Sequence, residues 1–288
     1  MNRNFKNLVI FLGPLVVFVS LFALIPVIGT FWISLFRDVS FLPEKKFVGI
    51  SQYVKLFRDG QTLRSIWFTF IFALTSVFLE MLLGVMAALV INENFRGRNV
   101  LRGMILIPWA IPSVVGARIW QLIFRYDYGA ANYVLRGVFG IHINWTATPL
   151  GALCVLVVAD AWRTTSFVAI IILAGLQTVP EELYEQGRID GADLFKRFFH
   201  ITLPAIKPVV IVALLFRTID ALRVFDILYI ITNGGPSGAT TSLSLYSYQY
   251  FLMGDFGYGS AVSVILFLMA FLCSLFYLKA GRFREAVS

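Results

Sequence analysis

The sequence predicts an all-α integral membrane protein with six transmembrane helices. Hydrophobic residues make up 59% of the 288-residue chain and charged residues only 14%, whereas about 25% of the residues in a soluble domain are charged. Apolar runs recur at lengths near the ~20 residues that cross the hydrocarbon core as a helix. A soluble protein of this length cannot bury so much apolar surface, so the chain is expected to lie in a membrane.

Six apolar runs define the predicted spans, at about 8–36, 65–91, 103–125, 149–175, 208–232 and 258–279. Helices are expected because every backbone amide in lipid needs an internal partner, and these runs are continuous, unlike the short alternating strands of a barrel. The first run is longer than the apolar part of a signal peptide, which predicts an uncleaved anchor. All six runs fit one transmembrane domain over residues 1–288.

Prolines interrupt two of the predicted spans. Pro14 and Pro26 lie in the first span, and Pro108 and Pro112 lie in the third. Each proline lacks a backbone N–H and should kink its helix or end it. Such kinks serve helix packing in many membrane proteins, and a hinge or a cavity-lining role is the alternative.

Basic residues indicate how the chain is oriented. With the N-terminus inside, twelve Lys and Arg residues lie on the inside and eight on the outside, so the positive-inside rule favours N- and C-termini in the cytoplasm. The bias is modest because the first outer loop is itself basic. The last outer loop, 233–257, has no Lys or Arg.

The remaining composition favours no metal or nucleic-acid site. Cys154 and Cys273 both fall inside predicted spans, which implies neither a disulfide framework nor a metal centre. The net charge of +8 is expected from basic residues that set topology and contact lipid headgroups. The sequence has no basic patch interleaved with exposed aromatic residues, so nucleic acid is not an expected partner.

A polar segment at about 178–207 separates the fourth and fifth runs. Thr178 and Glu181 have the spacing of a capping box, which predicts a short helix from about Pro180 to Asp190. Gly191 then permits a sharp turn. A second short helix would carry an apolar edge, and Pro204 with Pro208 would end it and begin the fifth span.

Such a helix–glycine–helix unit is suited to the groove of a partner protein. A solvated amphipathic loop at the bilayer surface is the alternative.

The same segment resembles the EAA loop of ABC importer permeases, in which a glutamate, a glycine six residues later and an I-x-L-P sequence recur at fixed spacing. The resemblance departs from the family at Gln186 and Gly187, where two alanines are usual. It implies the type I importer permease fold, with this cytoplasmic loop meeting a separate ATPase that binds ATP and Mg²⁺, and no cofactor in this chain. The residues expected to make that contact are Glu185, Asp190, Gly191, Ala192, Phe195, Ile201, Leu203 and Pro204.

Other segments extend the resemblance to the carbohydrate-uptake branch, of the maltose and glycerol-phosphate type. The matching stretches are 47–53, 226–229, 233–242 and 256–261. The resemblance implies a bacterial or archaeal cytoplasmic membrane protein. It implies as partners a second permease subunit, a dimer of ATPase subunits and an extracytoplasmic solute-binding protein, with a carbohydrate as substrate.

The predicted fifth span carries four charges, at Arg217, Asp220, Arg223 and Asp226. Intramembrane charges normally face a bundle interior or water, and neighbours such as Arg223 and Asp226 can pair at i, i+3. A charge-balanced packing network and a lining of the translocation path both fit this pattern.

A sugar pathway needs hydroxyl partners and aromatic faces, although tyrosine and tryptophan also anchor proteins at membrane interfaces. The candidate substrate-pathway residues are Trp162, Arg163, Asp220, Arg223, Asp226, Tyr229, Asn233, Gln249 and Tyr250.

Two other classes compete with an ABC permease. An enzyme that binds ATP itself would need a phosphate-binding loop of the G-x-x-x-x-G-K-[ST] type, and the sequence has none. An ion-coupled secondary transporter would use intramembrane carboxylates, which Asp220 and Asp226 supply, and often shows inverted repeats. ATP dependence of transport separates these alternatives.

Overall fold

The computed structural model describes residues 3–42 and 44–280. Within these residues, five helices are long and apolar enough to cross a membrane: Phe11–Ile33, Gly60–Asn92, Pro149–Leu176, Leu194–Leu222 and Phe256–Ala280. A bent pair of shorter helices adds a sixth crossing if the pair counts as one span. Arg282 and Arg284, two of the basic residues that bear on orientation, lie outside the described residues.

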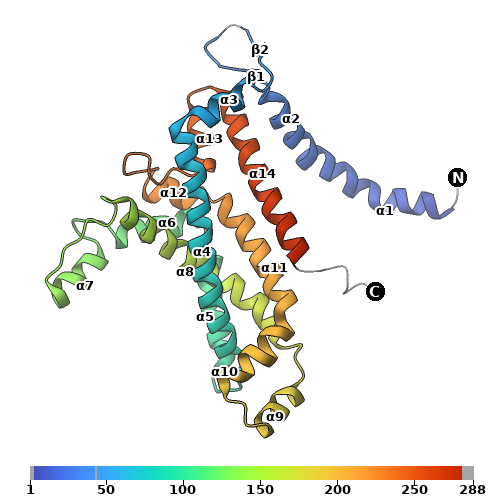
Figure 1. Cartoon of the computed structure of the whole chain (residues 1–288), viewed down its shortest axis with the longest axis vertical. Coiled ribbons are helices and arrows are strands. Elements are labelled where there is room, and N and C mark those ends of the chain that lie inside the picture. The colour runs from blue at the N-terminus through green and yellow to red at the C-terminus, as the bar shows by residue number, and fades with distance from the viewer. Residues whose placement is uncertain (1–2, 43, 281–288) are drawn as a thin grey trace. The chain divides into compact units, whose positions relative to one another are not determined.

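The chain divides into two compact units. The first unit comprises Met1–Leu63 and Tyr246–Leu268, and the second comprises Arg64–Leu245 and Met269–Ser288. Helices α4 (Gly60–Asn92), α13 (Leu243–Leu252) and α14 (Phe256–Ala280) each contribute to both units. The elements can be followed by label in Figure 1.

The first unit begins with an apolar helix of three parts: α1 (Arg3–Val19), a π-helical turn (Ser20–Leu24) and α2 (Ile25–Ile33). Pro14 lies inside α1 and Pro26 in the first turn of α2. The π turn precedes Pro26 and bonds the Ile25 N–H to the Ser20 carbonyl, five residues back. An inserted π turn shifts the backbone register, so the missing donor of Pro26 does not end the helix.

A short hairpin follows, with β1 (Phe36–Arg37) antiparallel to β2 (Lys46–Phe47). Helix α3 (Ser51–Arg58) comes next. The backbone at the start of α14 lies against this region, because Phe256 N–H donates to the Asp38 carbonyl at 2.9 Å. A Cβ at Gly257 would lie 2.1 Å from the Phe36 carbonyl oxygen, so only glycine fits there.

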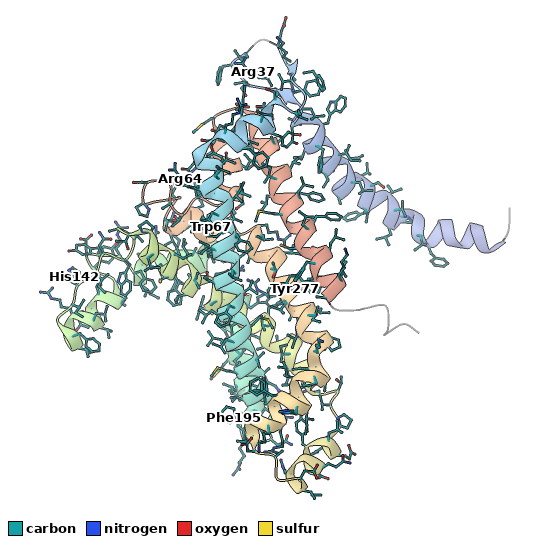
Figure 2. All side chains as sticks on the ribbon, viewed as in Figure 1. Arg37, Arg64, Trp67, His142, Phe195 and Tyr277 are labelled. Atoms are coloured by element: carbon teal, nitrogen blue, oxygen red, sulfur yellow. The ribbon has the colours of Figure 1, made fainter. Side chains whose placement is uncertain are left out.

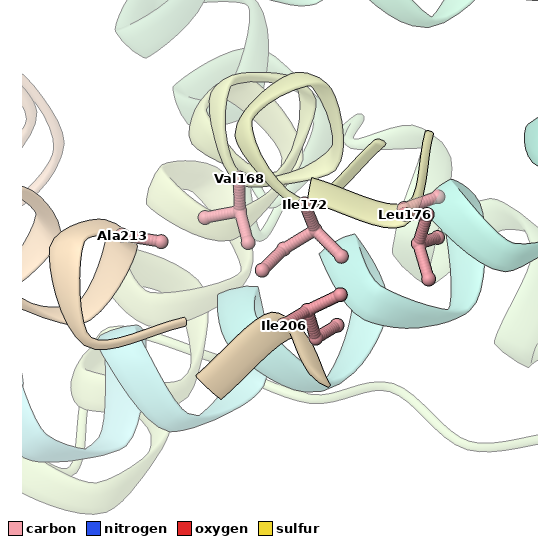
Figure 3. Close-up of a cluster of buried hydrophobic side chains, with 6 residues drawn as sticks. Val168, Ile172, Leu176, Ile206 and Ala213 are labelled. Carbon is pink, nitrogen blue, oxygen red and sulfur yellow. The ribbon is translucent and has the colours of Figure 1, made fainter. Parts of the chain in front are cut away.

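The second unit packs α8 (Pro149–Leu176) against α11 (Leu203–Leu222) and against α5 (Arg98–Ala110). Figure 3 shows part of the resulting core, in which Val168, Ile172 and Leu176 of α8 meet Ile206 and Ala213 of α11. Ala88 of α4 completes the cluster. Gly84 brings α4 close to α8, since a Cβ at Gly84 would lie 2.5 Å from a methyl group of Val168.

The predicted third span is not one straight helix. It forms α5 and α6 (Ser113–Ile123), bent by 92° between them. Pro112 immediately precedes α6, which confirms that this proline ends a helix, whereas Pro108 lies inside α5. Helix α6 packs on α12 (Asp226–Ile231), and α7 (Ala130–Phe139) follows before α8.

The predicted fifth span also has different bounds. The helix begins at Leu194, runs through a π turn at Phe198–Thr202 and ends at Leu222. Pro204 was expected to separate two helices, and this is wrong. The π turn bonds the Leu203 N–H to the Phe198 carbonyl, five residues back, and the helix continues with Pro204 in the first turn of α11. Residues 226–231, expected in the same span, form the separate helix α12.

Candidate functional site

The segment between α8 and α11 forms a helix–turn–helix. Helix α9 (Glu181–Ile189) carries Glu185 in its middle, with an exposed side chain. The predicted helix is therefore confirmed to within one residue at each end. The predicted capping box is wrong, because Pro180 occupies the cap position and the Thr178 hydroxyl donates to the Gly175 carbonyl of α8 at 2.8 Å.

Gly191 makes the turn that follows α9. Its φ of +74° lies in the left-handed region, which glycine adopts without the cost a Cβ imposes. Asp190 is the C-cap of α9, and the Ala192 N–H donates to the Gly187 carbonyl at 2.9 Å, as in a C-terminal helix cap. The sequence-based prediction of a glycine turn is confirmed.

Asp193 is the N-cap of helix α10 (Leu194–Arg197), and its carboxylate accepts a hydrogen bond from the Lys196 N–H at 2.7 Å. Its first two side chains, Leu194 and Phe195, are 74% and 77% exposed. Figure 2 labels Phe195 on this helix, and in Figure 1 α9 and α10 lie at the end of the second unit where α11 begins. The helix pair thus presents apolar groups beside the acidic α9.

Gly187 allows α9 to pack closely against the π turn at Phe198–Thr202. It is buried, and a Cβ there would lie 2.8 Å from the terminal methyl group of Ile201. Thr202 adds a hydroxyl contact with Tyr184 at 3.2 Å. Ile201 therefore packs against α9, and Leu203 and Pro204 follow at the start of α11.

A buried ionic cluster joins α4, α8 and α11. The guanidinium of Arg217 donates to both carboxylate oxygens of Glu80, at 2.6 and 2.9 Å, and lies 3.5 Å from Asp160. All three residues are at most 2% exposed. Ser76 and Thr164 add hydroxyl contacts to the same carboxyl groups.

Asp220 extends this cluster towards the surface. It accepts from Arg217 at 3.0 Å and from Arg223 at 2.6 Å. The pairing of Arg223 with Asp226 is therefore wrong, because Asp226 lies on α12 and accepts instead from the Ser113 hydroxyl of α6. The helix ends at Leu222, so Asp226 does not continue the i, i+3 pattern of the three charges before it.

The candidate substrate-pathway residues of the second unit, apart from the three charges above, lie on two different helices, α8 and α12, or at the end of α12. Trp162 meets Trp120 edge-on, with ring centroids 5.8 Å apart. The Nε of its neighbour Arg163 is buried and has no hydrogen-bond partner among the described residues. Tyr229 stacks on Phe225, and Asn233, with φ of +48°, closes the end of α12.

Gln249 and Tyr250 lie on α13 in the first unit. Tyr250 contacts the rings of Tyr246 and Tyr258, and the Tyr246 hydroxyl donates to Asp59 at 2.6 Å. Burial acts to raise the pKa of Asp59, but hydrogen bonds from Tyr246, Thr62 and two backbone N–H groups outweigh it and lower the pKa below its usual value. Burial and the Asp59 contact raise the pKa of Tyr246.

Sequence reasoning missed Glu80 and Asp160. Each is a single acidic residue within an apolar run, and such residues seldom occur in spans without a partner. Isolated charges in the second and fourth runs indicate that each needs a polar partner, although the sequence does not show that this partner is Arg217.

Comparison with known proteins identifies the chain. Residues 80–284 match the family described as binding-protein-dependent transport system inner membrane component. The trehalose/maltose transport system permease protein MalF of Thermococcus litoralis is 50% identical over 94% of this chain and 92% of the relative. The sulfoquinovosyl glycerol transport system permease protein SmoG of Agrobacterium fabrum is 38% identical over 96% and 91%.

A solved structure has the same fold. A chain of a bacterial ABC transporter involved in the import of the acidic polysaccharide alginate superposes with a TM-score of 0.83, covering 98% of this chain and 99% of that one at 23% identity. The fold is therefore that of a type I ABC importer permease in a multi-pass membrane protein, as the sequence predicted. The chain belongs to the binding-protein-dependent transport system inner membrane components, the permease family of ABC importers.

Proposed function

We propose that this chain is a permease subunit of an ATP-driven importer of a carbohydrate, of di- or oligosaccharide size, and forms half of the translocation pathway. The observation that carries the proposal is 50% identity, over almost the whole of both chains, to a permease named for trehalose and maltose. The N- and C-termini face the cytoplasm in this proposal, as the basic residues favour.

The helix pair α9–α10 is the proposed contact with a cytoplasmic ATPase. Short helices that present apolar side chains beside charged ones suit a groove on a partner. Exposed Phe195 and Leu194 would enter that groove, and Glu185 would contact its edge. Asp190, Gly191 and Ala192 set the turn, while Ile201, Leu203 and Pro204 join the pair to α11.

The other partners follow from the same proposal. A second permease subunit completes the pathway, a dimer of ATPase subunits binds ATP and Mg²⁺, and an extracytoplasmic solute-binding protein delivers the sugar. A neighbour of the same fold was solved with an alginate pentasaccharide-bound periplasmic protein, which supports the last of these.

The substrate pathway is proposed to use aromatic and hydrogen-bonding side chains of the second unit. The rings of Trp162 and Trp120 offer faces for a sugar, and the Nε donor of Arg163 has no partner in the part of the chain that the structure describes. Tyr229, which is 41% exposed, and Asn233 supply further polar atoms.

Transport in reconstituted vesicles tests the proposal. The permease pair and its ATPase would be inserted into liposomes with the cognate binding protein on one side and ATP on the other. ATP-dependent accumulation of labelled trehalose or maltose is expected, with none driven by a proton gradient alone. Accumulation that follows the gradient without ATP would contradict an ABC importer and favour a secondary transporter.

An anionic glycerol-linked solute is the second candidate. The relative named for sulfoquinovosyl glycerol, at 38% identity, favours it, and a glycerol-phosphate-type solute belongs to the same class. Competition by such solutes against labelled trehalose in the same vesicles distinguishes the two substrate classes.

A further inference from the structure

Helices α6 and α12 each follow a break in the chain, so the helix before the break does not fix their directions. Helix α6 is bent by 92° from α5, with Ile111 and Pro112 in extended conformations between them. Helix α12 follows the break at 223–225, where the Val224 carbonyl accepts from the Ser244 hydroxyl at 2.6 Å. Contacts with neighbouring elements must therefore hold these two short helices in place.

Two side-chain contacts join α6 to α12, one near each end. At the start of both helices, the Ser113 hydroxyl donates to the Asp226 carboxylate. Near the end of both, the Gln121 side-chain amide donates to the Ile230 carbonyl at 2.6 Å. The two α6 residues are separated by ~12 Å along the helix axis, and their partners on α12 are different residues. These two contacts together are called the α6–α12 clasp.

Arg118 fixes which way the Gln121 amide points. Its guanidinium donates to Gln121 Oε1 at 2.7 Å, and a guanidinium has no acceptor atom. The amide oxygen therefore faces Arg118, which leaves the Nε2 donor for the Ile230 carbonyl, itself only an acceptor. Both neighbours of Gln121 select the same orientation of its amide, so the contact with α12 is built into α6.

We propose that Gln121 and Ser113 are positioning residues for the sugar pathway, because the clasp keeps α12 at a fixed place against α6. The inference rests on the proposed function as a carbohydrate importer. Gln121 directly follows Trp120, one of the two rings proposed as a sugar face. The Ile230 carbonyl that it contacts directly follows Tyr229, which is 41% exposed. The clasp thus sets the spacing between pathway groups of two helices that no continuous backbone helix aligns.

Gln121→Glu separates the contact with Ile230 from the contact with Arg118. The ionised side chain still accepts from Arg118, but it has no proton to donate to Ile230. Uptake of labelled trehalose into the reconstituted vesicles should fall about fivefold per inserted permease, the loss expected for one hydrogen bond. Trehalose taken up per ATP hydrolysed should fall as well, whereas a smaller number of folded complexes would lower both rates together. Leu122→Met, at a neighbouring exposed side chain, is the matched control and should leave uptake unchanged.

The clasp also predicts that its two contacts depend on each other. Substitutions this far apart without a shared partner usually have additive effects on free energy, so their fold-changes multiply. Either contact alone should keep α12 partly in place, so Ser113→Ala should reduce uptake only about twofold. The double variant with Gln121→Glu should then lose more than the product of the single losses, and a loss equal to or below that product would overturn the clasp. Ser113→Thr keeps the hydroxyl and should behave as the wild type.

Hydrogen–deuterium exchange of the purified complex measures the clasp without transport. The backbone amides of α12 should exchange faster in Gln121→Glu than in the wild type or in Leu122→Met. Unchanged exchange would overturn the proposal. If Gln121→Glu fails to assemble, Ser113→Ala and Ser113→Thr make the same comparison, and equal α12 exchange in these two would overturn it.

The vesicle assay distinguishes failure of this inference from failure of the proposed function. Absence of ATP-dependent trehalose uptake by the wild type would refute the proposed function. Normal uptake by the wild type that Gln121→Glu and the double variant share would refute the positioning role alone, even where α12 exchanges faster.

Discussion

Gly191 is the residue whose conformation the proposed ATPase contact depends on most directly. It has φ of +74°, and a Cβ at this position would meet no atom within 4 Å. Substitution therefore costs backbone strain without a steric clash. A β-branched residue at positive φ is a strong outlier, with a cost of about 1–3 kcal/mol.

Gly191→Val should therefore change the angle between α9 and α10 and reduce copurification of the ATPase and substrate-stimulated ATP hydrolysis. Gly191→Asn is the matched control, because asparagine adopts the left-handed region more readily, and it should retain most activity. Equal and normal hydrolysis in both variants would show that the turn conformation does not matter for coupling.

Glu185 tests the coupling role through charge. Its side chain is exposed in the middle of α9, so Glu185→Lys should leave the protein inserted while uptake falls by about tenfold or more, the effect of ~1.4 kcal/mol of lost docking energy. Uptake and the amount of inserted protein would be measured together.

Glu182→Lys provides the control for helix stability. Glu182 is also exposed but lies in the first turn of α9, where reversing the charge opposes the helix dipole more strongly. If Glu182→Lys impairs uptake as much as Glu185→Lys, the loss reflects helix stability and the specific role of Glu185 is refuted.

The sequence predicts the local backbone conformation of single residues better than it predicts which distant side chains they contact. Gly191 could be assigned to a turn because its spacing and flexibility are local properties. The ion pair of Glu80 with Arg217 joins residues 137 positions apart, and no local pattern pairs them. The pathway residues and the ATPase contact remain predictions, since they depend on molecules outside this chain.

At the scale of elements, the sequence predicts some helix ends and not others. Pro112 ends a helix as expected, but Pro204 does not, because the π turn at Phe198–Thr202 absorbs its missing donor. The π turn inserts one residue into the hydrogen-bond register, and the apolar pattern of the run contains no sign of it. The long apolar helices and the break at Pro112 were predictable, whereas the π turn that carries the helix past Pro204 was not.

The junction of α3 and α4 carries a pH dependence through Asp59. Its carboxylate accepts hydrogen bonds from the N–H groups of Gln61 and Thr62 at the start of α4 and from the Tyr246 hydroxyl of α13. The pKa of Asp59 is lowered in the folded protein. Its charge therefore stabilises the fold fully above the unfolded pKa of about 3.9, and this stabilisation is lost as the pH falls through the folded pKa.

Asp59→Asn should consequently lower the thermal midpoint near pH 7. The difference in thermal midpoint between the variant and the wild type, called the gap below, should close below about pH 4. Thermal unfolding of the purified protein over a pH series measures this gap. Tyr246→Phe removes one donor to Asp59 and should narrow the gap without abolishing it. A gap that is constant with pH would exclude the Asp59 charge as its cause.

At the scale of the whole molecule, the bent pair α5–α6 decides the topology. The 92° bend between these helices fits either one broken crossing or a re-entrant segment that returns to the side it came from. In the first case the chain has six crossings and both termini share a side. In the second it has five, and the termini lie on opposite sides. The apolar pattern of the run from 103 to 125 is the same for both.

Three single cysteines distinguish these topologies, after Cys154 and Cys273 are replaced. Phe95 precedes α5, Tyr133 lies on α7, and Ile189 ends α9, at exposures of 44%, 83% and 86%. Because α8 crosses once, Tyr133→Cys and Ile189→Cys must react with a membrane-impermeant thiol reagent from opposite sides, which is the control. Phe95→Cys should react on the side of Ile189→Cys, since we expect α5 and α6 to cross together. If Phe95→Cys instead reacts on the side of Tyr133→Cys, the pair α5–α6 is re-entrant. Either the N-terminus or the α9–α10 segment would then lie outside the cytoplasm.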